Sequence, residues 1–168
     1  MENHNLIVVV GLPHHGKSTF ASMIARAQEG KKGDTSDIVI REFCTCQDLN
    51  EDHVRGNKEW YRPQLVALGN HLCDTKGPSY LSRELIKEGC TVIAGPRRLS
   101  EIEDLDDPFV VWINKEDPDE TPIIDNTEVE LLKERANLRV SFKKGDTQGM
   151  LDCAVGLAYV AHFLFRDN

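Results

Sequence analysis

A glycine-rich stretch near the N-terminus, GLPHHGKST at residues 11–19, has the spacing of a phosphate-binding loop. Four residues separate Gly11 from Gly16, and Lys17 and Ser18 follow, which gives the pattern G-x-x-x-x-G-K-[ST]. Glycines allow backbone angles at which successive N–H groups turn inward around an anion. Lys17 would then place its ammonium against the β and γ phosphates of a nucleotide, and Ser18 would ligate the accompanying Mg²⁺. The sequence therefore predicts a site for nucleotide phosphates.

The residues on either side of this loop fit a strand that leads into a helix. The apolar run NLIVVV before the loop is typical of a buried parallel strand. After the loop, Phe20, Met23 and Ile24 are spaced to share one face of a helix. A helix that begins near Lys17 would add its positive dipole end to the phosphate site.

Three more residues belong to the predicted nucleotide-binding loop. Thr19 offers a further hydroxyl to the phosphates. His14 and His15 fill variable positions of the pattern, and we expect both to be exposed imidazoles near the phosphates rather than metal ligands or bases.

Length, composition and charge favour one domain that binds small phosphorylated molecules. The chain has 168 residues, 40% of them hydrophobic, and a net charge of −8, which disfavours a broad nucleic-acid face. Its five cysteines lack C-x-x-C spacing and are expected to be reduced. The apolar runs around 5–10 and 154–165 are too short or interrupted to span a bilayer, and MENHN is not the basic start of a secretion signal. We expect a cytoplasmic protein with no membrane partner, and a homodimer is left open.

Five strand-like runs alternate with helical segments, which predicts an α/β fold with a parallel sheet covered on both faces. The strands are expected at 6–10, 37–43, 91–95, 109–114 and 138–142. The helices are expected at 17–29, about 59–74, 79–89, 126–136 and 148–165. The charged segment 29–37 is expected to be a loop.

Two segments of this single domain, 1–168, are expected to serve substrates. The excursion at about 44–88 separates the second and third predicted strands and is placed where such a fold would bind a phosphoryl acceptor. The segment at about 114–125 is charged and interrupted by proline, and it is placed where a lid would close over phosphates.

A site for phosphoryl transfer needs cations beyond the loop lysine. Arg97 and Arg98 follow the third predicted strand, at the edge where ligands gather in open α/β sheets. We predict that Arg97 is the catalytic cation, together with Lys17, because Arg98 lies one step further into a turn that should point it outward. The alternative is that both are surface arginines that pair with Glu101 or Glu103.

The predicted acceptor excursion contains its own cations and aromatic residues. Arg62 and Arg83 are candidates for holding an acceptor phosphate. Trp60, Tyr61 and Tyr80 are candidates for stacking on a base, with packing against the helices as the alternative.

Taken in order, these segments resemble the P-loop nucleoside monophosphate kinases, and most closely the bacteriophage-type deoxynucleoside monophosphate kinases. The matching segments are the loop at 11–19, RPQLVALG at 62–69, SYL at 79–81, GPRRLSE at 95–101 and DNTEVELL at 125–132. The resemblance implies a three-layer P-loop kinase fold with a five-stranded parallel sheet in the order 2-3-1-4-5. It also implies Mg²⁺ as cofactor and transfer of the ATP γ-phosphate to a (deoxy)nucleoside 5′-monophosphate. Arg97 falls on the family's arginine near the transferred phosphate, and Arg62 falls on an acceptor-side arginine.

The chain departs from the family pattern at Gly95, where the family has an aspartate that helps to organise the metal. Three alternatives therefore stay open. The first is a P-loop kinase with another acceptor, such as a nucleoside, a polynucleotide or a small metabolite. The second is a non-catalytic, regulatory nucleotide-binding protein. The third is a GTPase, because NKED at 114–117 fits N-K-x-D, although no D-x-x-G lies between the third strand and the next predicted helix.

Overall fold

The apolar run before the glycine-rich loop forms a central strand that is buried on both faces. In β1 (Ile7–Gly11), the four residues from Ile7 to Val10 are fully buried. Val8 and Val10 belong to the core on one face of the sheet, and Ile7 and Val9 to the core on the other. This alternation with full burial is what a parallel strand between two helical layers requires.

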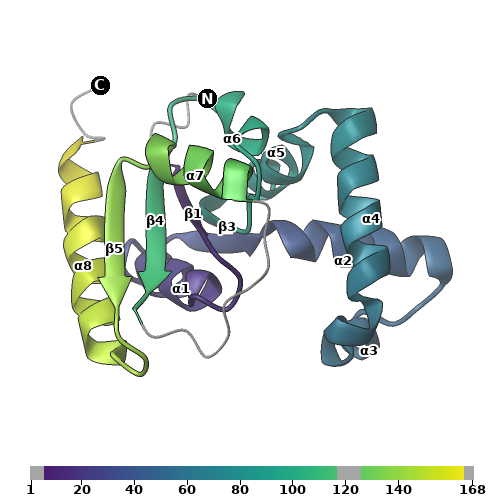
Figure 1. Cartoon of the computed structure of the whole chain (residues 1–168), viewed down its shortest axis with the longest axis horizontal. Helices are drawn as coiled ribbons and strands as arrows, with labels where there is room; N and C mark the ends of the chain where they lie inside the picture. The colour runs from purple at the N-terminus through teal and green to yellow at the C-terminus, as the bar shows by residue number, and fades with distance from the viewer. Residues whose placement is uncertain (1–5, 117–125, 165–168) are drawn as a thin grey trace.

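The computed structural model describes residues 6–116 and 126–164 (Figure 1). Its five-stranded sheet is parallel throughout, in the order β2-β3-β1-β4-β5. The other strands are β2 (Lys31–Asp34), β3 (Cys90–Ala94), β4 (Phe109–Lys115) and β5 (Leu138–Phe142). The predicted α/β class, the all-parallel sheet and the strand order are confirmed.

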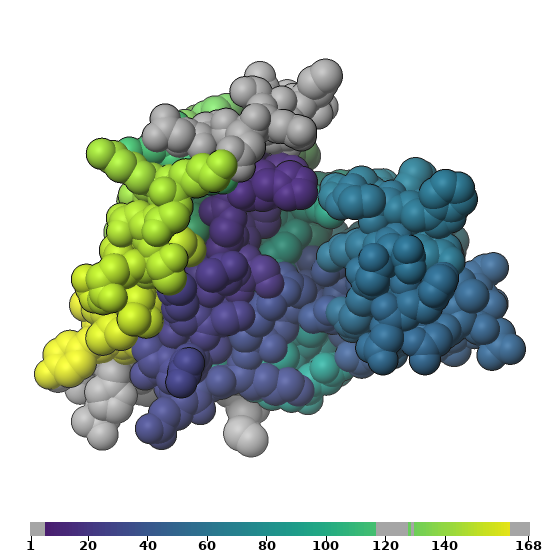
Figure 2. All heavy atoms as spheres, turned by 90° about the horizontal axis from the view of Figure 1, so that it is seen from below, coloured from purple at the N-terminus to yellow at the C-terminus, as the bar shows by residue number. Residues whose placement is uncertain are grey.

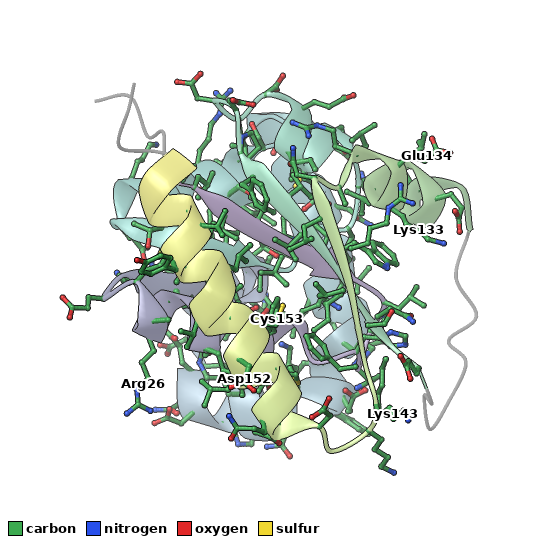
Figure 3. The ribbon with its side chains drawn as sticks, turned by 90° about the vertical axis from the view of Figure 1, so that its left-hand side faces the viewer. Arg26, Lys133, Glu134, Lys143, Asp152 and Cys153 are labelled. Atoms are coloured by element: carbon green, nitrogen blue, oxygen red, sulfur yellow. The ribbon has the colours of Figure 1, made fainter. Side chains whose placement is uncertain are left out.

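Helices cover both faces of this sheet. On one face, α1 (Lys17–Ala27) and α8 (Thr147–Leu164) bury Phe20, Ile24 and Leu157 against the strands, and Figure 3 shows α8 lying across the sheet. The other face is covered by α2 (Thr35–Gln47), α4 (Lys58–Lys76), α5 (Tyr80–Lys87), α6 (Ser100–Glu103) and α7 (Asn126–Arg135). The short α3 (Glu51–Gly56) and part of α4 extend sideways beyond the sheet (Figure 1).

The predicted strand at 37–43 is wrong, because these residues lie inside α2. The run of β-branched residues there favoured a strand, but Ile40 and Cys44, four residues apart, are both buried, as on one face of a helix. The Asp37 carboxylate also accepts a hydrogen bond from the backbone N–H of Asp34 at 3.3 Å. An acidic side chain that reaches back to the residue before a helix stabilises the helix start.

The true second strand, β2, lies in the segment 29–37 that the sequence predicted as a loop. Its sequence KKGD lacks the apolar alternation by which strands are recognised. Gly33 allows the strand to lie close to its neighbours, because a Cβ there would be 2.7 Å from Leu85 Cδ2 and 2.9 Å from Cys90 Sγ. Short, lysine-bearing strands are typical of sheet edges.

The remaining predicted elements agree with the structure to within a few residues, and α3 and α6 were not predicted. Most of the predicted lid, residues 117–125, lies outside the described residues, as does residue 165 of the last predicted helix. Of the predicted lid, residues 114–116 are described. Asn114 and Lys115 form the end of β4, and the Glu116 N–H donates to Phe142 O at 2.9 Å. Within the described ranges, every helix is too short or too polar to cross a membrane.

The tight packing of β2 can be tested by substitution at Gly33. Gly33→Val should lower the free energy of unfolding by about 1–3 kcal/mol, because the added side chain would overlap buried Leu85 and Cys90. Gly56→Val in α3 is the matched control, since a Cβ at Gly56 would meet nothing within 4 Å. Urea unfolding of both variants measures the difference, and equal effects at the two positions would contradict the packing of β2.

Candidate functional site

The predicted phosphate-binding loop is a tight turn from β1 into α1. A Cβ on Gly11 would lie 2.4 Å from Ile113 O, so only glycine fits where the chain leaves the strand. Gly16, with φ of 81°, directly precedes α1 in the left-handed region that glycine tolerates. The first N–H groups of a helix have no partners within the helix, and they lie at the positive end of its dipole. The loop therefore has the backbone form of an anion site.

A cavity of about 430 Å³ opens beside this loop. Figure 2 shows a hollow between the loop and α1 on one side and the lobe formed by α3 and α4 on the other. The polar lining comes from the loop, from the start of α2, from α4 and from the turn after β3. Apolar side chains complete the walls, among them Val39, Leu65, Trp112 and Leu132.

The cavity is basic, although the chain as a whole is acidic. Against a net charge of −8 for the chain, the lining contains five basic side chains and two acidic ones, namely Lys17, Lys58, Arg62, Arg97, Arg98, Asp34 and Glu101. One of the two acids, Glu101, is buried behind the arginines and accepts hydrogen bonds from their backbone. A concave site with excess positive charge favours a small anionic ligand.

The loop lysine is held in the cavity in a partly desolvated state. Lys17 Nζ donates to the carbonyl oxygen of Leu12 at 2.6 Å. Burial, and next the positive charge of Arg97, lower the pKa of Lys17 to about 8, while Asp34 acts in the opposite direction. An anion bound beside Lys17 would favour its charged form.

Ser18 faces a carboxylate that the sequence did not point to. Ser18 Oγ donates to Asp34 Oδ2 at 2.8 Å. Lys32 Nζ donates to Ser18 Oγ at 2.6 Å and also contacts the Asp34 carboxylate. Asp34 and Lys32 were missed because their strand was predicted as a loop. The signal for Asp34 was the cap pattern DTSD at 34–37, with one acidic residue before the helix and another three residues later.

The structure explains why residue 95 is a glycine here. Gly95 has φ of 111°, and a Cβ on it would lie 2.4 Å from Thr35 Oγ1 at the start of α2. No aspartate fits at this position. Asp34, whose strand partner is Ala94, instead brings a carboxylate to the same edge of the sheet from the neighbouring strand.

The turn after β3 is fixed through its backbone by a buried acid. Glu101 Oε1 accepts hydrogen bonds from the backbone N–H groups of Arg97, at 3.2 Å, and Arg98, at 3.1 Å. Burial is the main cause that raises the pKa of Glu101, and these two bonds act against it. Glu101 thus holds the backbone of both arginines, and both residues line the cavity.

The two arginines differ in how their side chains are held. Arg98 Nη2 donates to Asn70 Oδ1 of α4 at 2.7 Å, so the prediction that Arg98 points outward is wrong. The hydrogen bond to Asn70 holds its guanidinium against α4. Arg97 is exposed, and its charge is close enough to Lys17 to lower the pKa of that lysine.

Helix α4, which lies across the hollow from the loop (Figure 2), contributes two cations to the lining of the cavity. Arg62, which the sequence predicted, lines the cavity, and its guanidinium pairs with Glu59 at 2.5 Å. Lys58, one helical turn earlier, was not predicted, and its Nζ donates to Ser36 Oγ at 3.1 Å. The spacing of four residues places both on one face of α4.

Four of the residues predicted for the acceptor do not line this cavity, namely Arg83, Trp60, Tyr61 and Tyr80. Arg83 donates instead to Asp104 O at 3.2 Å. The Trp60 side chain is 79% exposed, and Tyr61 packs against Phe43 with ring centroids 5.6 Å apart. Tyr61 and Tyr80 are both partly buried against the core, so for these two the packing alternative holds.

The two loop histidines have different environments. His14 is exposed and lines the cavity, as expected. The prediction that His15 is exposed is wrong, since it is buried and its Nδ1 accepts the Lys115 N–H at 3.0 Å. Burial, followed by the charges of Lys17 and Lys115, lowers the pKa of His15, so the ring stays a neutral acceptor.

The residues present fit a Mg²⁺ ion that arrives with phosphates. In the ranges 6–116 and 126–164, no group of three or more His, Cys, Asp or Glu side chains could hold a metal by itself. Mg²⁺ in phosphate sites needs only one or two protein oxygen ligands besides the phosphates and water. The Ser18 hydroxyl and the Asp34 carboxylate, 2.8 Å apart, offer such oxygens. Asp34 lines the cavity, whereas Ser18 and Thr19 are both exposed and are not among its lining residues.

Comparison of the chain with known protein families found no matching family model, and comparison with curated proteins found no match. What the fold and the site define is an α/β protein whose glycine-rich strand-to-helix loop opens on a basic cavity.

The lowered pKa of Lys17 predicts a pH-dependent stability difference. Between pH 8 and the ordinary lysine value of 10.5, unfolded Lys17 holds a proton that the folded residue has lost, so the wild type gains stability as the pH rises. Lys17→Met lacks this effect. The free energy of unfolding of Lys17→Met, relative to that of the wild type, should therefore be highest below pH 8 and should fall toward pH 10.5. Urea unfolding of both proteins from pH 7 to 10.5 checks this, and a constant difference would contradict the desolvation of Lys17.

Proposed function

We propose that the protein is an ATP-dependent phosphotransferase that transfers the γ-phosphate to a nucleoside or deoxynucleoside 5′-monophosphate. The observation that carries the proposal is the distribution of charge in the cavity. Lys17 belongs to the loop, Lys58 and Arg62 belong to α4 on the other side of the hollow in Figure 2, and all three line the cavity together with Arg97. Two sets of cations around one cavity suit a reaction that brings two phosphate groups together.

The loop side is suited to the donor. The N–H groups at the start of α1 and the Lys17 ammonium would bind the β and γ phosphates of ATP. Mg²⁺ bound with ATP would be held by Ser18 and Asp34 and would neutralise charge on the phosphate oxygens. Because Lys17 is partly desolvated, its interaction with phosphate is stronger than that of a lysine in water.

The α4 side is suited to the acceptor. Lys58 and Arg62 would hold the acceptor phosphate, and apolar side chains such as Val39, Leu65 and Trp112 offer a wall for a base. An acceptor phosphate oxygen would form the new bond to the γ phosphorus while the bond to the β–γ bridging oxygen breaks and ADP leaves. An ionised phosphate is its own nucleophile, so this acceptor needs no general base. Arg97 would stabilise the charge on the transferring group.

One observation favours a second candidate, a kinase that phosphorylates a hydroxyl group. Asp34 lines the cavity, and a carboxylate near the donor phosphates is placed to take the proton of an attacking hydroxyl. The bonds of Asp34 to Ser18 and Lys32 occupy its oxygen Oδ2, so this oxygen is not available to an attacking hydroxyl, which favours the monophosphate. A GTPase has less support, because Asn114 is not a lining residue of the cavity and its Nδ2 donates to Ser141 Oγ at 3.5 Å.

A coupled assay of ADP release across all ribo- and deoxynucleoside monophosphates, with nucleosides as a second panel, tests the proposal. ADP release is expected with at least one monophosphate, and Lys17→Met should abolish it. A preference for nucleosides would favour the hydroxyl-directed alternative. ATP binding without ADP release for any acceptor would favour a regulatory nucleotide-binding protein.

Arg97→Ala should lower kcat about a hundredfold, since removing a cation that stabilises the transferring group costs about 3 kcal/mol. ATP affinity, measured by calorimetry, should change little. Arg98→Ala, whose guanidinium is already bonded to Asn70, should change kcat by less than about threefold. The control is Arg83→Ala, which removes an arginine outside the cavity. A larger loss of kcat for Arg98→Ala than for Arg97→Ala would exchange their roles.

Lys58→Ala and Arg62→Ala should each raise the acceptor KM about tenfold and leave the ATP KM unchanged, because a contact used equally in ground and transition states affects KM alone. Steady-state kinetics with the preferred acceptor measures both constants, again with Arg83→Ala as the control. A raised ATP KM in either variant would place the donor, rather than the acceptor, against α4.

A further inference from the structure

A lysine ammonium lies against the two oxygens that a metal ion would need. Lys32 and Asp34 flank Gly33 in β2, so their side chains leave the sheet on the same face, toward the first turn of α1. Lys32 Nζ donates to Ser18 Oγ at 2.6 Å and contacts Asp34 Oδ2, while Ser18 Oγ donates to the same carboxylate oxygen at 2.8 Å. The ammonium, hydroxyl and carboxylate thus contact one another in a closed set of three.

This contact is more shielded than an ordinary surface ion pair. The side chains of Lys32 and Asp34 are 22% and 19% exposed. The adjacent Lys31 has a side chain 55% exposed, and its Nζ donates to the carbonyl oxygen of Glu88 at 3.0 Å. The two lysines of β2 therefore have different partners, because side chains alternate along a strand and only Lys32 points toward Ser18.

An ammonium and a divalent cation cannot use these oxygens together. Mg²⁺ requires oxygen ligands at about 2.0–2.1 Å in near-octahedral geometry, and Mn²⁺ accepts similar oxygen ligands. An ammonium that donates to the same hydroxyl and carboxylate occupies the space on their exposed side and repels a second positive charge. Lys32 would have to leave Ser18 and Asp34 before a metal could coordinate either one.

We propose that Lys32 competes with the divalent cation for Ser18 and Asp34, and that this competition sets the metal affinity of the site. In the absence of metal, the Lys32 ammonium balances the negative charge of the Asp34 carboxylate. The arrival of a metal together with a nucleotide displaces it. The nucleotide part of this inference rests on the proposed function, whereas the competition itself rests only on the contacts of Lys32.

Binding of Mn²⁺ to the full chain, followed by the electron paramagnetic resonance signal of the free aqueous ion, tests this competition. Lys32→Met removes the charge and keeps the length of the side chain, and it should bind Mn²⁺ at least about tenfold more tightly than the wild type, because a repelling unit charge at contact distance is gone. Lys32→Gln should show the same direction. Lys31→Met is the matched control and should equal the wild type, and Lys32→Met/Asp34→Asn should lose the gain.

The titration is performed once without nucleotide and once with saturating ADP, which separates the two hypotheses. Unchanged or weaker Mn²⁺ binding in both Lys32 variants, under either condition, overturns the competition. Failure of every protein to bind ADP, with a gain in Mn²⁺ affinity for Lys32→Met, overturns the proposed function and leaves the competition standing. Thermal unfolding checks the folded state, since Mn²⁺ should raise the Tm of Lys32→Met more than that of the wild type.

Discussion

The close approach of Gly11 to β4 fixes the geometry of the whole site. A Cβ at Gly11 would be 2.4 Å from the carbonyl oxygen of Ile113, so the chain can turn there only without a side chain. Immediately after this turn, α1 is anchored in the core by Phe20 and Ile24, which are fully buried. The first turn of α1 therefore has little freedom, and Lys17 enters the cavity as part of a rigid unit. The distances of the other site residues from Lys17 therefore depend on the position of this turn.

Near the loop, the fold holds Lys17, Arg97 and Arg98 through hydrogen bonds to neutral oxygens or through their backbone N–H groups. Lys17 donates to a carbonyl oxygen, and the peptide N–H groups of Arg97 and Arg98 are bonded to buried Glu101. Burial and, next, repulsion from Arg97 lower the pKa of Lys17. Such repulsion lowers stability, and a bound anion relieves it. A site built in this way is organised for its ligand before the ligand arrives.

The sequence predicted the parts of the structure that depend on local pattern, and it failed where packing decides. The loop at 11–19 and the strand before it follow from glycine spacing and an apolar run. β2 carries no such pattern. Gly33 lies in a strand because it packs closely against Leu85, which the sequence alone does not reveal. Asp34 and Lys32, in the same strand, were therefore missed. On α4, which residues face the cavity depends on the rotation of the helix, and this could not be known before its neighbours were placed.

β2 lies at one end of the sheet, and no described strand pairs with its outer side. An exposed strand edge is a template on which another molecule can add a strand, the usual first step of edge-to-edge aggregation. Here the edge is only four residues long, so an added strand would gain only a short ladder of hydrogen bonds. The shortness of β2 therefore limits this route to aggregation, although the ammonium groups of its two lysines are engaged with Ser18, Asp34 and Glu88.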